Sequence, residues 1–398
     1  MSDISIPNFR FKKYTSNLVK TKLSKIATFN PKSLLPENFK YIDLESVLGT
    51  ELVSCREETR ETAPSRAQRV AQKGDVFYQL VRPYQKNNYL FDLNENNYVF
   101  STGYAQLRPK VDSAFLLARL QEEGFVNKVI ERCTGTSYPA INSKDLSRIS
   151  ITIPEDFDEQ SAIGSLFRTL DALLASYKNN LANYQSLKST MLSNMFPKSG
   201  QTVPEIRLDG FDGEWEIKKF KSISTKRGKS NSKGYDYPAY SVSNQSGLIP
   251  QSEQFDGSRL ENLEKTSYKI VEPNEFAYNP ARINVGSIAF NDLDETVIVS
   301  SLYVIFSLDK SINNNYALLF IKSPKFNKEV RRNTEGSVRE YLFYENFANI
   351  RIPIPPSLEE QQAIGVYFSN LDSLITAHQE KISQLETLKK KLLQDMFI

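Results

Sequence analysis

The sequence predicts an α+β protein with two mixed α/β domains separated by a pair of long antiparallel coiled-coil helices, arranged as a pseudo-twofold internal repeat. Three observations support this fold class. The chain has 398 residues, which is longer than one hydrophobic core usually serves. A long helical segment occurs twice. Each copy follows a segment in which short β-rich runs, such as 74–81, 98–107 and 297–306, alternate with Gly, Pro and Asn turns.

The long repeat aligns residues 154–196 with residues 355–397 without a gap. A shorter repeat places Ile6–Phe11 over Val203–Leu208. Each half therefore contains a basic lead-in, a variable segment and an amphipathic helix, in that order. The expected divisions are a first domain with its lead-in at 1–153, a central helix and connector at 154–203, a second domain at 204–353 and a C-terminal helix at 354–398.

The repeated helices carry apolar residues at alternating spacings of four and three, which is typical of a coiled-coil seam. Asp156 with Glu159, and Ser357 with Glu360, fit capping boxes at the two helix starts. A helix of about 40 residues is roughly 60 Å long, and each copy is the expected partner of the other. The predicted seam consists of Ile163, Phe167, Leu170, Leu174, Tyr177 and Leu181 in the first helix and Ile364, Phe368, Leu371, Ile375, His378, Ile382 and Leu385 in the second.

Histidine and cysteine usage argues against a metal site. His378 is the single histidine and falls on the seam, where a packed residue is the favoured interpretation. Cys55 and Cys133 are far apart, so neither a disulfide framework nor a metal knuckle is expected. The N-terminus lacks a signal-peptide core, and no stretch approaches the ~20 apolar residues of a membrane span. These features predict a soluble, cytoplasmic protein without a membrane partner.

Basic residues gather in the two lead-ins. Residues 4–36 hold seven basic and no acidic residues, and so do residues 217–235. Such runs are usually solvated surface, but their corresponding positions in the two halves favour contacts to DNA phosphates. The candidates are Lys12, Lys13, Lys22 and Lys25 in the first half and Lys219, Lys226, Arg227 and Lys229 in the second.

Base-edge contacts would come from the variable segments, at 27–148 and 224–349. Arginine pairs with guanine, and Asn or Gln pairs with adenine. Most such residues are ordinary polar surface groups in any protein, so this set is the less specific one. The candidates in or beside turns are Arg66, Gln68, Arg69, Gln79, Arg82 and Tyr84 in the first half and Tyr240, Ser243, Asn244, Gln245, Asn279 and Arg282 in the second.

Motifs for catalysis are not found. Gly228-Lys229-Ser230 matches the end of a phosphate-binding loop, but Ile223 stands where that loop needs its first glycine. Asn279-Pro280-Ala281 departs at its third position from the Asn-Pro-Pro-aromatic motif of base amino-methylation. The sequence therefore predicts no catalytic residue and no metal ligand.

The doubled motif resembles a known family. An Ile-x-Ile-Pro strand, then Glu-Gln-x-x-Ile, then a long helix ending in Met-Phe occurs at 151–196 and again at 352–397. The second lead-in adds Pro204-Glu205-Ile206-Arg207 and Gly213-Glu214-Trp215. This pattern is similar to that of the specificity subunits of type I restriction-modification systems. The first lead-in departs from it at Leu18, which stands in place of the tryptophan.

The resemblance implies a definite role. Each domain would be a target-recognition domain that reads one half of a bipartite, asymmetric site in double-stranded DNA. The helix pair would set the spacing and dock two methyltransferase subunits, which restriction motor-nuclease subunits would join. S-adenosylmethionine, ATP and magnesium would be bound by those partners, and this chain would carry no cofactor. A scaffold that does not bind DNA, and whose coiled coil joins two unrelated binding domains, is the alternative that the residues leave open.

Overall fold

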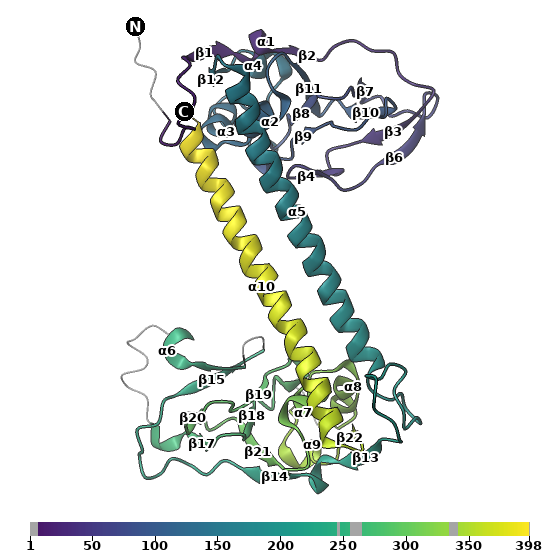
Figure 1. The fold of residues 1–398 in the computed structure, drawn as a ribbon, viewed down its shortest axis with the longest axis vertical. Coiled ribbons are helices and arrows are strands. Elements are labelled where there is room, and N and C mark those ends of the chain that lie inside the picture. The colour runs from purple at the N-terminus through teal and green to yellow at the C-terminus, as the bar shows by residue number, and fades with distance from the viewer. Residues whose placement is uncertain (1–6, 245–246, 255–264, 334–340, 398) are drawn as a thin grey trace. The chain divides into compact units, whose positions relative to one another are not determined.

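The computed structural model describes residues 7–244, 247–254, 265–333 and 341–397. The chain divides into two compact units (Figure 1). Unit 1 contains residues 1–180 and 378–398, and unit 2 contains residues 181–377. The two long helices, α5 (Phe157–Asn194) and α10 (Leu358–Met396), each contribute residues to both units. The chain is thus a mixed α/β protein of two units.

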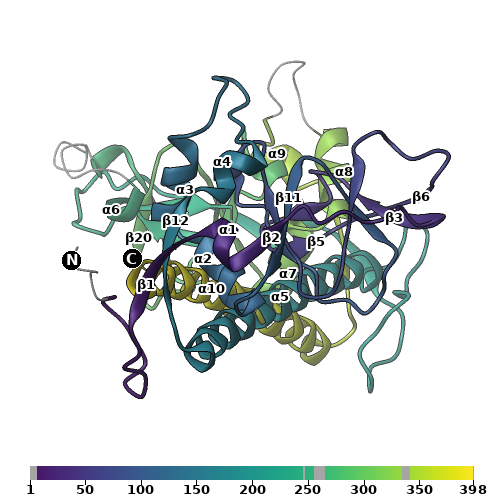
Figure 2. The same ribbon diagram turned by 90° about the horizontal axis from the view of Figure 1, so that it is seen from above.

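Unit 1 is built on two four-stranded sheets. A strand pair, β1 (Leu18–Lys22) with β12 (Ser150–Pro154), leads into α5. The β6 and β3 strands lie on the opposite side of the unit from β1 in both views (Figure 1, Figure 2). The first sheet has the order β2-β11-β8-β9, with bounds Ala27–Phe29, Tyr104–Pro109, Val76–Gln79 and Tyr89–Leu90. The second has the order β6-β3-β10-β7, with bounds Arg56–Thr59, Asn38–Ile42, Tyr98–Ser101 and Ala67–Val70.

Short helices cover the first sheet and join it to α5. Their apolar side chains form one core with β8, β11 and β12, including Phe115, Phe125 and Ile151, which are almost fully buried. The short elements of unit 1 are α1 (Leu23–Ile26), β4 (Val47–Leu48), β5 (Glu51–Leu52), the 3₁₀ turn η1 (Pro83–Gln85), α2 (Ser113–Gln121), α3 (Glu123–Ile130) and α4 (Ser143–Ser147).

The lead-in strand pair and the main sheet of unit 2 have the same strand order as those of unit 1, whereas its remaining strands form two-stranded sheets. A strand pair, β13 (Glu216–Lys219) with β22 (Arg351–Ile354), leads into α10. The main sheet has the order β14-β21-β18-β19, with bounds Ser224–Arg227, Val304–Leu308, Phe276–Tyr278 and Ile288–Phe290. The other elements are η2 (Phe220–Ser222), β15 (Tyr240–Ser243), β16 (Gly247–Pro250), α6 (Gln251–Gln254), η4 (Lys265–Ser267), β17 (Lys269–Val271), η5 (Ile283–Val285), β20 (Val297–Val299), α7 (Asn314–Ile321), α8 (Pro324–Asn333) and α9 (Tyr344–Phe347).

The predicted capping boxes are half right. Ser357 Oγ accepts a hydrogen bond from the backbone N–H of Glu360 (3.1 Å), and Asp156 Oδ1 accepts one from Asp158 (2.8 Å), as N-cap residues do. The glutamates do not reach back to complete the box. Glu159, 1% exposed, instead accepts two hydrogen bonds from the Arg10 guanidinium, at 2.6 and 2.7 Å. A buried carboxylate without a charged partner destabilises the fold more than the loss of a second capping bond at the helix start, so the glutamate pairs with the arginine.

The second helix start repeats this arrangement. Glu360, also 1% exposed, accepts hydrogen bonds from Arg207 at 2.8 and 2.7 Å. Arg10 and Arg207 are the arginines that the shorter sequence repeat aligns. The bidentate pairs therefore fasten each lead-in to the first turn of the helix of its own unit.

The Gln-x-x-Ile-Gly part of the motif seats each long helix on its domain. Gln160 Oε1 accepts from the backbone N–H of Asp112 (3.2 Å), and Gln361 Oε1 accepts from Asn313 (2.9 Å). Both acceptor contacts go to the N-cap residue of the next helix, α2 or α7. Gly164 lies so close to α2 that an added Cβ would stand 2.3 Å from Asp112 Oδ1. Glycine is required there because the helices approach so closely.

The seam residues of unit 1 lie in or against its core. Ile163, Phe167, Leu170, Leu174 and Leu385 are buried there, and Tyr177 and Ile382 pack against them. The rings of Tyr177 and His378 are 5.3 Å apart. Lys178 pairs with Glu386 at 2.9 Å, and Lys389 pairs with Asp171. Asp171 meets Lys389 near the end of α10, whereas Tyr177, farther along α5, meets His378, so the two segments are antiparallel within this unit.

Unit 2 buries Ile364, Phe368 and Leu371 in its own core, and Lys188 pairs with Asp372. Leu181 and Ile375 are half-buried. The helix ends are also buried: Met195 and Phe196 lie in the core of unit 2, and Met396 and Phe397 lie in the core of unit 1. Each unit is thus completed by the end of the helix that starts in the other half of the sequence.

Candidate nucleic-acid interface

The first lead-in presents its basic residues to solvent. Lys12 and Lys13 precede β1, Lys22 ends it, and Lys25 lies in α1; all four are exposed. None forms an ion pair with a described carboxylate. The Lys13 ammonium lies 4.6 Å from the centre of the Tyr14 ring. Because the Arg10–Glu159 pair anchors this segment, the charges are held at a fixed place on unit 1.

In the second lead-in, two of the basic residues are paired with acids from distant parts of the sequence. Lys226 and Arg227 are exposed on β14, but Lys226 pairs with Glu345 at 2.7 Å, which lowers the pKa of that carboxyl. Arg227 donates to Ser307 Oγ (3.1 Å) and lies 3.6 Å from Glu275 Oε1. Lys219 is half-buried in β13, and Lys229 is exposed. Acids from distant parts of the sequence therefore pair with two of these cations, which the charge pattern of residues 217–235 does not reveal.

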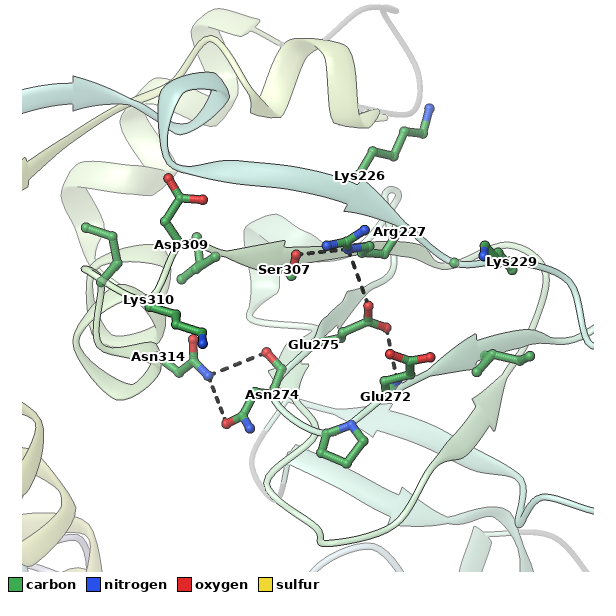
Figure 3. A pocket seen from close by; sticks show the side chains of 15 residues that line it. Lys226, Arg227, Lys229, Glu272, Asn274, Glu275, Ser307, Asp309, Lys310 and Asn314 are labelled. Carbon is green, nitrogen blue, oxygen red and sulfur yellow. Dashed lines mark hydrogen bonds and ion pairs between the residues drawn. The ribbon is translucent and has the colours of Figure 1, made fainter.

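Lys226, Arg227 and Lys229 line a cleft of about 830 Å³ (Figure 3). Lys310 adds a fourth cation to its wall, but Glu272, Glu275 and Asp309 also line it. Burial raises the pKa of Glu275. The cleft is therefore polar, with four cations and three acids among its lining residues.

The base-edge candidates of unit 1 fall in two separate places. Arg66, Gln68 and Arg69 lie on or beside β7. Gln68 Nε2 donates to the carbonyl of its neighbour Ser65 (2.8 Å). Arg69 is half-buried opposite Phe100, and this burial lowers the pKa of its guanidinium. Its position in a sheet makes Arg69 a packed residue more than a surface contact.

Arg82 and Tyr84 belong instead to the turn after β8, in the other sheet. Arg82 has left-handed backbone (φ 54°) and is the N-cap of η1. Its guanidinium lies 4.4 Å from the centre of the Tyr138 ring. Tyr84 and Tyr138 are 50% and 63% exposed, so this corner carries two large aromatic rings in solvent. Sequence reasoning missed Tyr138, because nothing local marks a contact with a turn so far away in the chain.

Unit 2 has a turn at the corresponding place. Arg282 is exposed, follows β18 and is the N-cap of η5, as Arg82 is of η1. Tyr240 is half-buried in β15, and Asn244 is exposed in the turn after it. Gln245 lies outside the described residues. The two arginines aligned at similar depth in the sequence thus begin corresponding 3₁₀ turns.

A second group of cations in unit 2 was also missed. Lys328 and Arg331 are exposed on α8, and Arg332 pairs with Glu329. On the same helix, Lys325 donates to the carbonyls of Phe196 and Pro197, just after the end of α5. A basic amphipathic helix was the available signal, since residues 324–333 contain four cations and one acid.

The described residues contain neither a candidate metal site nor a helix that could span a membrane. In that part of the chain, no group of three or more His, Cys, Asp or Glu residues is placed to hold a metal ion. No described helix is long and apolar enough to cross a bilayer.

Known proteins share both the sequence pattern and the fold. The model of the type I restriction modification DNA specificity domain matches residues 68–184 and 213–387. The MjaVIII type I restriction enzyme specificity subunit of Methanocaldococcus jannaschii is 22% identical over 303 residues, which is 71% of this chain and 69% of that protein.

Two solved structures share the fold along nearly the whole chain. An S subunit of a type I restriction-modification system from M. genitalium has a TM-score of 0.64 at 14% identity, covering 99% of each chain. A chain in a structure that addresses assembly and conformational transition of the type I R-M system has a TM-score of 0.52 at 20% identity, covering 96% of this chain and 98% of that one. The family model matches well over half of the chain, once in each half, and the chain therefore belongs to the family of type I restriction-modification DNA specificity proteins.

Proposed function

We propose that the chain is the non-catalytic DNA-specificity subunit of a type I restriction-modification complex and binds a bipartite, asymmetric site in double-stranded DNA. Residues 1–153 and 204–353 would each form a target-recognition domain for one half of the site. The observation that carries the proposal is that the family match falls separately in each half, on units whose lead-in strand pair and main sheet have the same strand order.

The two units carry unlike side chains on this shared scaffold. The η1 turn after Arg82 reads Pro83-Tyr84-Gln85, whereas the η5 turn after Arg282 reads Ile283-Asn284-Val285. Base contacts come from side chains at such exposed turns, and phosphate contacts give affinity and register. Similar scaffolds with different turns favour two different half-sites, which makes the whole site asymmetric.

The long helices would set the distance between the half-sites. α5 has 38 residues and α10 has 39, so each is roughly 57–59 Å long at 1.5 Å per residue. One turn of DNA is about 34–36 Å, which a pair of such helices can span. In this proposal the helices at 154–203 and 354–398 form an antiparallel coiled coil that relates the units by a pseudo-twofold axis.

The partners follow from the same role. Two methyltransferase subunits would dock on the helix pair and the adjacent domain surfaces, and restriction motor-nuclease subunits would join through them. S-adenosylmethionine, ATP and magnesium would be bound by these partners for adenine methylation or cleavage. The complex would act in the cytoplasm.

A domain exchange tests the proposal. Residues 27–148 would be replaced by the corresponding segment of another family member, and the site bound by the chain with its methyltransferase subunits would be determined. We expect one half of the site to change and the other to stay, with exchange of residues 224–349 as the matched control that changes only the second half. Simultaneous change of both halves would contradict modular reading. Failure of the unaltered complex to select any DNA would favour the alternative of a scaffold without a DNA site.

A further inference from the structure

The turn between β8 and β9 is strained at two residues that have side chains. Arg82 and Lys86 flank η1, and both have left-handed backbone, with φ of 54° and 57°. This conformation is uncommon for residues other than glycine, asparagine and aspartate, and such strain gathers at functional sites. The Lys86 side chain pairs with Glu123 at 2.6 Å, which leaves Arg82 as the residue whose side-chain role is still to be explained.

The strained turn is joined to a second loop, residues 134–140. The Arg82 backbone N–H donates to the Pro139 carbonyl (2.7 Å), and Ile141 donates to the Leu80 carbonyl (3.0 Å). Thr134 and Ala140 exchange two backbone hydrogen bonds at the base of that loop, at 2.9 and 3.0 Å. The two loops therefore form one rigid corner of unit 1.

A buried amide supports the turn from below. Gln79 is 2% exposed and donates through Nε2 to the Val81 carbonyl (2.7 Å) and to Gln85 Oε1 (2.9 Å). The Gln79 backbone N–H donates a hydrogen bond to Asn88 Oδ1 (2.8 Å). These bonds fix both ends of η1, so the Arg82 and Tyr84 side chains start from a fixed backbone.

The Arg82 guanidinium is held by an aromatic ring and not by an acid. It lies 4.4 Å from the centre of the Tyr138 ring, and it makes no ion pair with any carboxylate of the described residues. A guanidinium held over a ring face keeps its in-plane N–H donors available, and these donors match the paired acceptors of guanine.

Unit 1 contains a contrasting arginine on a tyrosine. Arg56 lies 5.2 Å from the centre of the Tyr41 ring but also pairs with Glu58 at 3.3 Å. Its charge is therefore paired within the protein, by Glu58 and, at 4.0 Å, by Asp43. Arg56 is a matched control, because it is also an arginine beside a tyrosine ring but one whose charge is paired with carboxylates.

We propose that Tyr138 is a positioning residue that holds Arg82 to read a guanine through the major groove, in the half-site bound by unit 1. The inference rests on the proposed function and adds to it the base, the reading residue and the loop that orients it. The exposed ring of Tyr138 lies against the guanidinium and would shield it from water when DNA covers the corner.

Selection from a randomised duplex pool tests this proposal. The full chain in complex with its methyltransferase subunits would be mixed with the pool, and the bound DNA would be sequenced. The unaltered complex should enrich a bipartite motif with a guanine in one half. If the unaltered complex enriches no bipartite motif, it is the proposed function that is wrong, and not the role of Tyr138.

The variants then address the arginine–tyrosine pair. Arg82→Ala and Tyr138→Ala should each lower the preference for that guanine by about tenfold, since loss of a bidentate arginine contact has an effect of this order. Tyr138→Phe keeps an aromatic face and should restore the preference to within about twofold of the original. Arg56→Ala should leave both halves of the motif unchanged.

Two further variants separate reading from folding. Arg82→Gly suits left-handed backbone, so it should fold at least as well as Arg82→Ala and still lose the guanine preference. Tyr138→Leu keeps an apolar side chain without an aromatic face and should behave like Tyr138→Ala. A guanine preference that survives Tyr138→Leu while Arg82→Gly abolishes it would overturn the positioning role. A uniform loss at every position would place Arg82 among the phosphate contacts instead.

Discussion

At the scale of single residues, the contacts of the repeated motif explain why the same residue types occur in both copies. Glu159 and Glu360 hold the lead-in arginines, and Gln160 and Gln361 hold the N-cap residues of α2 and α7. The repeat in the sequence indicated that these positions matter. It did not indicate their partners, because each bond joins residues far apart in the chain and a repeat contains no information on contacts.

Gly164 and Gly365 differ in a way that stability can reveal. A Cβ on Gly164 would stand 2.3 Å from Asp112 Oδ1 and 2.7 Å from the Phe115 nitrogen, whereas a Cβ on Gly365 would lie 3.1 Å from the Asn315 Cβ. Gly164→Ala should therefore destabilise the protein by about 1–3 kcal/mol through overpacking. In Gly365→Ala the helix propensity of alanine, up to about 1 kcal/mol, offsets the milder crowding.

Thermal unfolding of the full chain measures this difference, with Gly365→Ala as the matched control. Equal melting temperatures for the two variants would show that α2 can move away from α5 without cost. They would thereby contradict the close approach described above.

At the scale of elements, helices and strands were easier to predict than surfaces. The 4-3 spacing and the N-caps placed α5 and α10 well because helical periodicity and capping are local properties. The β-rich run 98–107 proved to be two strands, β10 and β11, on different sheets. Nothing in the run marks the change of sheet, since both strands are apolar and buried.

The candidate interface was harder to predict for the same reason. Composition located the basic lead-ins, but it could not show that Glu345 and Glu275 would fold against Lys226 and Arg227. It also could not bring Tyr138 to Arg82. Both depend on tertiary contacts that leave no periodic signal in the sequence.

The lead-in lysines should contribute unequally to DNA affinity. Lys12→Ala and Lys229→Ala remove exposed cations without a described acidic partner, and each should lower the slope of log affinity against log salt by about one. Lys226→Ala should change the slope less, because its charge is already paired with Glu345. Titrations of one DNA duplex at several salt concentrations measure these slopes. A larger loss for Lys226→Ala than for Lys229→Ala would mean that DNA displaces the Glu345 pair.

At the scale of the whole molecule, helix length should set the spacing between half-sites. Insertion of one heptad into α5 and one into α10, after Leu181 and after His378, keeps the seam in register and adds roughly 10 Å. About 10 Å corresponds to roughly three base pairs of DNA. Sequencing of the bound sites should then show a spacer longer by about three base pairs with unchanged half-sites. Retention of the original spacer would show that helix length does not set the distance between half-sites. Insertion into α5 alone is the control, because it should disrupt the pairing of seam residues.

The exchange of helix ends has a consequence for half-length chains. Phe397 fills the core of unit 1 and Phe196 fills that of unit 2. A polypeptide that stopped after the first Met-Phe would therefore lack the residue that fills its own core, and its own Met-Phe end would have no core to enter. In a pair of identical copies, the Met-Phe helix end of each copy would fill the core of the other. The pair would then present two identical DNA-binding domains. Such a homodimer would favour palindromes, and duplication of one half followed by fusion would be a simple route from palindromic to asymmetric sites.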